Sequence, residues 1–496
     1  MKLFCQRVIR VEEMSDLVSI LKQLHKSDEY PLHMPGHKRN YGSDFLSDAY
    51  GIDITEIEGY DNLYEAEGIL KDAMERAARV YGAEETFFLV NGSTVGILSA
   101  ITGVLKRGER ILAARNCHKA VFHAIELREL QAVYLHPEYL SDWDIQGGIQ
   151  IEEVREKLEQ YPDIKAVIVT SPTYEGIVSP IAEIARLVHE YNIPLIVDEA
   201  HGAHFPFDQR FPESAIQAGA DVVIQSMHKT LPSFTQTALL HMKKGYVDTD
   251  RIREYIGYYQ TSSPSYLFMA GMDHCICEIE KKKSHLWDEF FQMREDFIKR
   301  MGNLSHIRIF LQNDACKLMI SVKGTDMNGH QLQEVLLNKY HIQLEMAAES
   351  YVLGIITMCD TKEGFNRLGE ALLEIDKELK VKDSKLSKEF NPESMENMLF
   401  EDGSSINLAK NRVQEEMVYS LAQVRELKKE EVLLKEAAGR VCAGYINVYP
   451  PGIPLYLPGE RITEEGIELI QRYLDKKLNV QGIRNLRISV CEELYA

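Results

Sequence analysis

The fold follows from one stretch of sequence, Ile193-Pro194-Leu195-Ile196-Val197-Asp198-Glu199-Ala200-His201. Its apolar first half predicts a strand buried on both faces, as in a parallel sheet, and Asp198 follows directly at the strand end. A second apolar run, Val222 to Gln225, is followed in the same way by Ser226-Met227-His228-Lys229. Ligands of such sheets bind beyond the carboxyl ends of the strands. We therefore expect Asp198 and Lys229 to face one site.

The same alternation of apolar strand and helical pattern extends outward from residue 70. Helical patterns cover Lys71 to Tyr81 and Val95 to Leu105. The expected strands share short apolar runs bounded by turn residues: Thr86–Val90, Ile111–Ala114, Ala132–Leu135, Ala166–Thr170, Pro194–Val197, Val222–Gln225 and Ala238–Met242. This pattern predicts an α/β fold with a mostly parallel sheet in a large domain, residues 31–300.

Three further segments flank the large domain. Residues 1–30 are expected to form a helical arm, with an amphipathic helix over 12–27. Lys282 to Met301 reads as a long polar helix that leads to a small α/β domain, residues 301–380, with strands at Arg308–Leu311, Lys317–Val322 and Tyr351–Met358. Residues 381–496 are expected to hold a linker, rich in Lys, Glu, Asp and Ser up to 410, and a C-terminal α+β domain with a helix over Thr463–Lys476.

Composition restricts the class of protein. The chain has 496 residues and a net charge of −20, which argues against a nucleic-acid or anionic-membrane surface. The start lacks an apolar signal segment, and no run approaches the length of a transmembrane helix. The eight cysteines are scattered, with Cys275 and Cys277 the one close pair, so neither a disulfide framework nor a metal site is expected. We predict a cytoplasmic protein with reduced thiols.

The strand-end pair Asp198 and Lys229 suits pyridoxal 5'-phosphate. A lysine amine forms a Schiff base with this cofactor, and a carboxylate pairs with its pyridine nitrogen and keeps that nitrogen protonated. Each residue has a simpler interpretation, since Asp198 could be a surface carboxylate and Lys229 a solvated loop lysine. The buried strand before Asp198 would make an unpaired charge costly, which favours the cofactor.

A phosphate site is predicted where the strand Thr86–Val90 ends. Gly92-Ser93-Thr94 opens the next helix, and the free N–H groups and hydroxyls of a helix N-terminus bind anions. Most such turns are only helix caps. Ser226 and His228, beside Lys229, are expected to supply further donors.

His118 follows the strand Ile111–Ala114. Its ring could stack on the cofactor face or cap the next helix, and spacing alone does not separate the two.

The chain resembles the Orn/Lys/Arg decarboxylase family, pyridoxal-phosphate enzymes of the aspartate-aminotransferase fold (fold type I). The matching motifs run through nearly the whole chain in the family's order. They are Pro31-Leu32-His33-Met34-Pro35-Gly36-His37-Lys38, Asp53-Ile54-Thr55-Glu56, Gly59-Tyr60-Asp61-Asn62-Leu63-Tyr64, Leu89-Val90-Asn91-Gly92-Ser93-Thr94, Arg115-Asn116-Cys117-His118-Lys119, Ser171-Pro172-Thr173-Tyr174, Asp198-Glu199-Ala200-His201-Gly202-Ala203-His204-Phe205, Ser226-Met227-His228-Lys229, Thr261-Ser262-Ser263-Pro264-Ser265-Tyr266, Tyr449-Pro450-Pro451-Gly452-Ile453-Pro454 and Pro458-Gly459-Glu460.

The resemblance implies roles residue by residue. Lys229 matches the Schiff-base lysine, Asp198 the partner of the pyridine nitrogen, and His118 the ring that stacks on the cofactor. His201 matches a ring near the cofactor's phenolic oxygen, and the remaining cofactor contacts are Ser93, Thr94, Ser226 and His228. Thr261 and Ser262 lie in a segment that reaches a neighbouring subunit's site, which implies a homodimer or higher oligomer. Glu460 matches an acid near the substrate entrance and is expected to hold the substrate's distal cation.

The implied reaction is decarboxylation of arginine, lysine or ornithine to the corresponding polyamine-type amine. Nothing in the residues decides the substrate; short members of the family include arginine decarboxylases, which favours arginine and its product agmatine. Large members carry an N-terminal receiver-like domain that builds higher oligomers, and the motifs here begin by residue 31, so that domain is expected to be absent. An aminotransferase on the same fold and a non-catalytic cofactor-binding protein remain alternatives.

Overall fold

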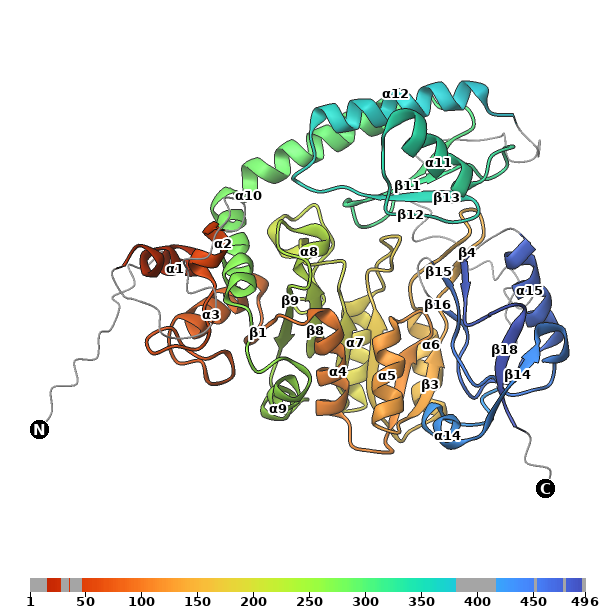
Figure 1. Cartoon of the computed structure of the whole chain (residues 1–496), viewed down its shortest axis with the longest axis horizontal. Coiled ribbons are helices and arrows are strands. Elements are labelled where there is room, and N and C mark those ends of the chain that lie inside the picture. The colour runs from red at the N-terminus through yellow and green to blue at the C-terminus, as the bar shows by residue number, and fades with distance from the viewer. Residues whose placement is uncertain are drawn as a thin grey trace, which may run out of the picture.

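A seven-stranded sheet forms the centre of the computed structural model, which describes residues 16–27, 35, 47–380, 416–449, 453–475 and 479–492. The strand order is β1-β9-β8-β7-β6-β2-β3 (Figure 1). The strands are β1 (Glu85–Leu89), β2 (Arg110–Ala114), β3 (Gln131–Leu135), β6 (Ile164–Thr170), β7 (Leu195–Asp198), β8 (Val222–Ser226) and β9 (Ala238–Met242). The mostly parallel sheet predicted from the sequence is confirmed: β9 alone runs antiparallel to both of its neighbours.

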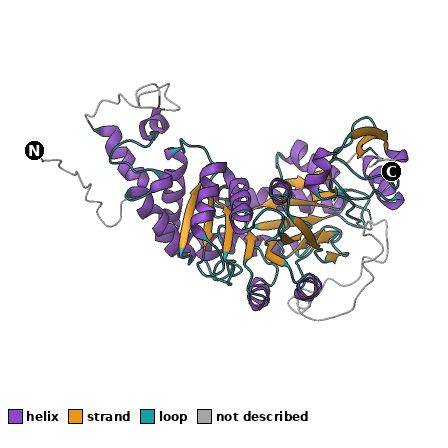
Figure 2. Ribbon diagram, turned by 90° about the horizontal axis from the view of Figure 1, so that it is seen from below, coloured by secondary structure: helices purple, strands orange, loops and turns teal. Residues whose placement is uncertain are grey.

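Helices cover both faces of this sheet, which explains its uninterrupted apolar strands (Figure 2). Alternate residues point to opposite sides: Ile196 and Ile224 join one core, whereas Val197 and Val223 join the other. The helices of the large domain are α3 (Ile69–Tyr81), α4 (Gly92–Val104), α5 (Lys119–Leu127), α6 (Ile151–Gln160), α7 (Ile181–Glu190), α8 (Met227–Thr230) and α9 (Thr249–Tyr259), with η1 (Leu63–Glu65), η2 (Phe205–Phe207) and the short pair β4 (Tyr139–Leu140) and β5 (Ile145–Gln146).

A long helix, α10 (Tyr266–Met301), leads out of the large domain. The sequence predicted this helix only from Lys282, so the expected start was wrong. The first half is apolar and buried, with Tyr266, Met269 and Ile276 in the core, and therefore lacks the polar pattern of the second half. Near its start, α10 packs against α1 (Leu17–Lys26) and α2 (Ser47–Ile52).

The small domain lies above the large sheet, at the end where α8 follows β8 (Figure 1). Its four-stranded antiparallel sheet has the order β10-β11-β13-β12. The elements are β10 (Arg308–Phe310), β11 (Lys317–Ser321), α11 (Gly329–Tyr340), β12 (Met346–Ala347), β13 (Tyr351–Ile355) and α12 (Lys362–Glu378). This position puts the small domain over the carboxyl ends of the parallel strands.

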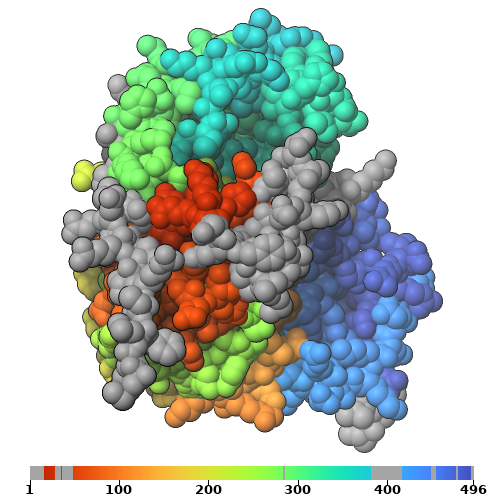
Figure 3. All heavy atoms as spheres, turned by 60° about the vertical axis from the view of Figure 1, so that its left-hand side comes forward, coloured from red at the N-terminus to blue at the C-terminus, as the bar shows by residue number. Residues whose placement is uncertain are grey.

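The C-terminal segment packs beside the large domain (Figure 3). It has a hydrophobic core of its own, which includes Tyr456, Ile470 and Val490. Its elements are α14 (Leu421–Glu426), β14 (Lys429–Leu433), η5 (Leu434–Glu436), β15 (Ile446–Tyr449), β16 (Ile453–Tyr456), α15 (Glu464–Asp475), β17 (Asn479–Gln481) and β18 (Arg487–Cys491). The expected linker between 381 and 415, the motif at 31–38 apart from Pro35, and residues 450–452 lie outside the described residues.

A search of the helices in the described ranges for a membrane-spanning segment finds none with the required length and apolar character.

Helix α4 packs unusually close to α9 because Gly103 has no side chain. A Cβ at Gly103 would lie 2.8 Å from the Cα of Ile252 in α9. We expect Gly103→Ala to lower the melting temperature, because an overpacking cost of about 1–3 kcal/mol against backbone exceeds the ~1 kcal/mol that alanine gains in a helix.

Gly257, in α9, is the matched control, since a Cβ there would meet nothing within 4 Å. Gly257→Ala should leave the melting temperature unchanged or raise it. Equal melting temperatures for both variants would contradict the close-packing account.

Candidate active site

Two neighbouring strand ends carry the central pair of side chains. Asp198 is the last residue of β7 and is 3% exposed; one of its carboxylate oxygens accepts a hydrogen bond from the Ala200 N–H at 3.1 Å. Lys229 lies in the short helix α8, directly after β8, which pairs in parallel with β7. The carboxylate and the amine thus lie at the same edge of the sheet, as the topology requires.

The Lys229 amine is partly buried, and its Nζ lies 3.2 Å from His201 Nε2. Burial lowers the pKa of Lys229 below its ordinary value, while the negative charges of Asp198 and Glu345 oppose that shift. A lowered pKa increases the fraction of neutral amine at neutral pH, and the neutral amine is the form that attacks an aldehyde.

His201 is buried between two amines. Its Nδ1 lies 2.6 Å from the Nζ of Lys317, the first residue of β11 in the small domain. Burial, and then the charges of Lys229 and Lys317, hold the pKa of His201 well below its ordinary value. Sequence analysis placed Lys317 in a strand and missed it as a site residue. A sequence signal was present, because Lys317 directly precedes the apolar run Leu318–Ile320, and the structure shows that the whole strand is buried.

His118 caps helix α5, with its Nδ1 accepting the Ala120 N–H at 3.2 Å, so the capping alternative is confirmed. Its ring nevertheless remains solvent-exposed. Its pKa is lowered by burial of the surrounding region and by Lys229, and is raised by the charge of Asp198. His118 therefore lies near both charges, and the stacking role stays a prediction beside the observed cap.

The start of α4 offers unused donors for an anion. Asn91, its N-cap residue, makes no side-chain cap hydrogen bond, and Gly92 has a φ of +77°. Ser93 and Thr94 follow in the first turn. The Ser226 hydroxyl at the end of β8 is buried and has no hydrogen-bond partner among the described residues. An uncapped helix N-terminus and an unpaired buried hydroxyl fit a phosphate group.

His228 is half-buried beside Lys229, and its Nδ1–H donates to the Thr237 carbonyl oxygen at 3.0 Å. Burial lowers its pKa, the bond to Thr237 raises it, and the charge of Lys229 lowers it. Together with Asp198, Lys229 and the α4 N-terminus, this group fits pyridoxal phosphate. A buried carboxylate, an amine with a lowered pKa and hydrogen-bond donors for an anion all lie at the ends of the sheet's strands.

Thr261 lies beside the start of α4, where its backbone N–H donates to the Asn91 side-chain oxygen at 3.2 Å. Both Thr261 and Ser262 are exposed in this single chain. The predicted substrate role of these two residues has no direct contact to support it within the chain.

Glu460 is buried at 1% exposure and is engaged within the protein. Both of its carboxylate oxygens lie 3.2 Å from Arg115 Nη2, and one accepts the Leu457 N–H at 2.7 Å. Arg115 directly follows β2, so this ion pair ties the C-terminal domain to the edge of the large sheet. Holding the substrate's cation stays a prediction for Glu460, and Arg115 is the partner that sequence analysis missed.

One cluster has the composition of a metal site. Nitrogen, oxygen and sulfur atoms of His204, Asp314 and Cys316 lie within 4.8 Å of one another, and all three residues are buried. Asp314 Oδ1 is already bonded to His204 Nε2 and to the Cys316 N–H, both at 2.9 Å. Burial raises the pKa of the Cys316 thiol, whereas a metal ligand must be a thiolate. We therefore interpret this cluster as a hydrogen-bonded buried acid.

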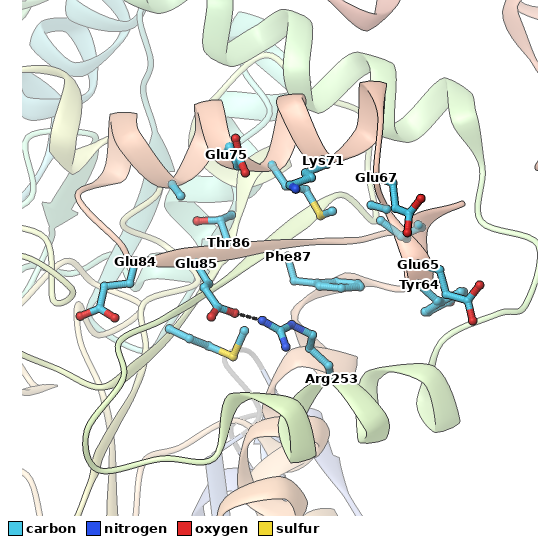
Figure 4. Close-up of a pocket in the computed structure, with 15 residues that line it drawn as sticks. Tyr64, Glu65, Glu67, Lys71, Glu75, Glu84, Glu85, Thr86, Phe87 and Arg253 are labelled. Atoms are coloured by element: carbon cyan, nitrogen blue, oxygen red, sulfur yellow. Dashed lines mark hydrogen bonds and ion pairs between the residues drawn. The ribbon is translucent and has the colours of Figure 1, made fainter. Parts of the chain in front are cut away.

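A hollow of about 580 Å³ lies beside β1, the outermost strand on one side of the large sheet (Figure 4). Its lining includes Tyr64, Glu85 and Arg253 and none of the candidate site residues named above. An ion pair between Arg253 and Glu85 crosses it.

Comparison with known proteins places the chain in one family of enzymes. Residues 15–317 match the family described as Orn/Lys/Arg decarboxylase, major domain, and residues 406–481 match its C-terminal domain. An uncharacterized Bacillus subtilis protein, YaaO, is 36% identical over 95% of this chain and 96% of its own length. A Bacillus subtilis arginine decarboxylase is 33% identical over 93% and 94%. The crystal structure of the Francisella novicida lysine decarboxylase LdcF superposes with a TM-score of 0.80 at 21% identity, covering 96% of this chain and 81% of that one.

The buried pair Arg115–Glu460 generates a stability prediction. Removing one partner of a buried ion pair leaves an uncompensated charge and costs about 3–5 kcal/mol. We expect Glu460→Gln to lower the melting temperature measurably in a thermal unfolding experiment.

Glu416 pairs with Arg461 at 2.7 Å on the surface and provides the control. Glu416→Gln should cost at most ~1 kcal/mol, as exposed pairs do. Equal losses in the two variants would mean that Glu460 does not anchor the domain.

Proposed function

This chain belongs to the Orn/Lys/Arg decarboxylase family, and from that premise we propose that it converts arginine to agmatine and carbon dioxide, ahead of lysine or ornithine as substrates. It is a pyridoxal-phosphate-dependent amino-acid decarboxylase. The observation that carries the proposal is the Lys229 amine, desolvated, held 3.2 Å from His201 Nε2 and next to the strand end of Asp198.

When bound, pyridoxal phosphate supplies an electron sink for the pair of electrons left at Cα as carbon dioxide departs. Lys229 is proposed to hold the cofactor covalently through Nζ. Asp198, buried and with one recorded donor at Ala200, would accept the pyridine N–H and keep that proton in place. Ser93, Thr94 and Ser226 would hold the phosphate, and the His118 ring would cover the cofactor face.

Two groups can return a proton to Cα. Lys229 Nζ is one, since burial lowers its pKa and so makes the amine a better proton donor than an ordinary lysine. His228 is the other, because its Nδ1–H is fixed on the Thr237 carbonyl, which orients the ring beside Lys229. Orientation of the scissile bond by these groups would decide which bond at Cα breaks.

The preference for arginine rests on kinship, while one acid of the small domain suits the distal cation that arginine, lysine and ornithine share. Arginine decarboxylases of three Bacillus species are 31–33% identical over most of this chain, whereas the lysine decarboxylases are 24–25% identical. Glu345 of the small domain influences the pKa of Lys229 by its charge and accepts a hydrogen bond from Tyr174. A carboxylate at that position would suit a distal cation.

We also propose that the enzyme works in the cytoplasm as a homodimer or a higher oligomer, in polyamine synthesis. The exposed Thr261 and Ser262, next to the N-terminus of α4, are available to a second copy.

The test is carbon dioxide release by purified, cofactor-loaded protein offered arginine, lysine and ornithine separately, with the amine products identified. We expect release from arginine and agmatine as product. Release from lysine or ornithine alone would overturn the substrate assignment, and keto acid without carbon dioxide would indicate an aminotransferase.

Lys229→Ala should abolish turnover in the same assay, because no other amine replaces the covalent link. The cofactor should still bind through its phosphate. Lys165→Ala removes an exposed lysine of β6 and should leave turnover unchanged. Turnover at the normal rate in Lys229→Ala would sink the assignment of Lys229.

Asp198→Ala should lower kcat by several orders of magnitude, since each 1.36 kcal/mol of lost transition-state stabilisation costs about tenfold. Asp163→Ala, which removes an exposed carboxylate paired with Arg110, is the control and should keep the normal kcat. A near-normal kcat in Asp198→Ala would count against the pairing with the pyridine nitrogen.

A further inference from the structure

Lys317 is a fully buried lysine that the proposed reaction does not use. It is 0% exposed and opens β11 in the small domain, whereas His201 and Lys229 belong to the large domain. The His201 ring bridges the two amines, with 2.6 Å from Nδ1 to Lys317 Nζ and 3.2 Å from Nε2 to Lys229 Nζ. One imidazole thus connects a small-domain amine to the amine proposed to carry the cofactor.

The surroundings of Lys317 are shaped for its side chain. Gly176 has a φ of +95°, and a Cβ there would lie 2.6 Å from Lys317 Cγ, so only glycine leaves room for the stem. The Tyr174 ring lies 5.7 Å from Lys317 Nζ and packs edge-on against His201, with 5.0 Å between ring centroids. These contacts fix the amine at His201 Nδ1.

The charges around Lys317 favour an ammonium. Asp314 is buried nearby, and its pKa is lowered, against the effect of burial, by His204, by Lys317 and by the Cys316 N–H. Burial lowers the pKa of Lys317 to about 8, against the raising effect of Asp314. At pH 7 Lys317 is therefore mainly protonated. The other titratable groups whose charges act on Lys317 or His201 are Asp314, Cys316, Glu175, Lys229, His204 and His228, and the Tyr174 ring packs against the pair.

If Lys317 is an ammonium, its hydrogen bond to His201 Nδ1 decides which of the two ring nitrogens of His201 carries the proton. A neutral imidazole has one N–H, and an ammonium has donors only. If Lys317 donates to Nδ1, the ring proton must be on Nε2, the atom that faces Lys229. The reverse arrangement needs a neutral Lys317 that accepts from Nδ1–H.

We propose that Lys317 is a positioning residue that donates to His201 Nδ1 and so keeps His201 protonated on Nε2, directed at the Lys229 nitrogen. This inference rests on the proposed function in that Lys229 carries the cofactor. The Nε2–H and the nearby positive charge both disfavour a proton on the Lys229 nitrogen once that nitrogen is linked to the cofactor. Through His201, a lysine of the small domain would thus influence the protonation of the Lys229 nitrogen in the large domain.

The test is a pH titration of the visible absorbance of the holoenzyme's cofactor, without substrate. Lys317→Met removes the charge and the donor, so the midpoint at which the Lys229 nitrogen loses its proton should rise by about one pH unit, a tenfold change in proton affinity. Lys317→Arg keeps a cationic donor and should restore most of the normal midpoint. Lys339→Met, which removes an exposed lysine of α11, should not change it.

An unchanged or lowered midpoint in Lys317→Met overturns the proposal. Nitrogen-15 NMR of the histidine-labelled normal protein provides a second measurement that does not depend on the folding of Lys317→Met, with His201→Gln used only to assign the signal. A proton on Nε2 supports the proposal, and a proton on Nδ1 overturns it. If the normal protein shows no imine absorbance, or if Lys229→Ala retains it, the assignment of Lys229 is wrong. The NMR result on His201 does not depend on that assignment, so the two failures can be distinguished.

Discussion

The burial of the parallel strands on both faces is the constraint on which the rest of the structure depends. The central residues of β6 (Ala166–Val169), β7 (Leu195–Val197) and β8 (Val222–Ile224) are apolar and buried because helices cover each side. Polar groups are costly inside such a sheet, so side chains with chemical function appear where the strands end. For that reason Asp198 ends β7 and Lys229 follows β8 in the short helix α8, close enough for the charge of Asp198 to act on the amine.

Desolvation then sets the acid–base properties of the site. Burial lowers the pKa values of Lys229, Lys317, His118, His201 and His228, all of which are basic groups. Asp198 provides the opposing charge next to Lys229. A site with many basic groups, an uncapped helix N-terminus and a buried unpaired hydroxyl is suited to an anionic cofactor that carries an aldehyde.

Each of the two smaller domains contacts the large domain through a buried charged side chain. The small domain contributes Lys317, whose amine contacts His201. The C-terminal domain contributes Glu460, whose carboxylate pairs with Arg115 at the end of β2. Both links place a charged group in the interior with a specific partner, which is costly unless the geometry is maintained. The arrangement of the side chains at the strand ends therefore depends on the position of each domain.

The sequence by itself determined the strands of the large sheet, the strand-end positions of Asp198 and Lys229, and the motifs of the family. Periodicity and strand ends are local properties, so a single chain segment reveals them. It missed the buried half of α10, where an apolar helix lacks a polar face. Only the tertiary structure decided that Lys317 meets His201 and that Arg115 meets Glu460, because these partners lie 116 and 345 residues apart in the chain. Contacts at such separations depend on how the domains pack, and no local pattern encodes them.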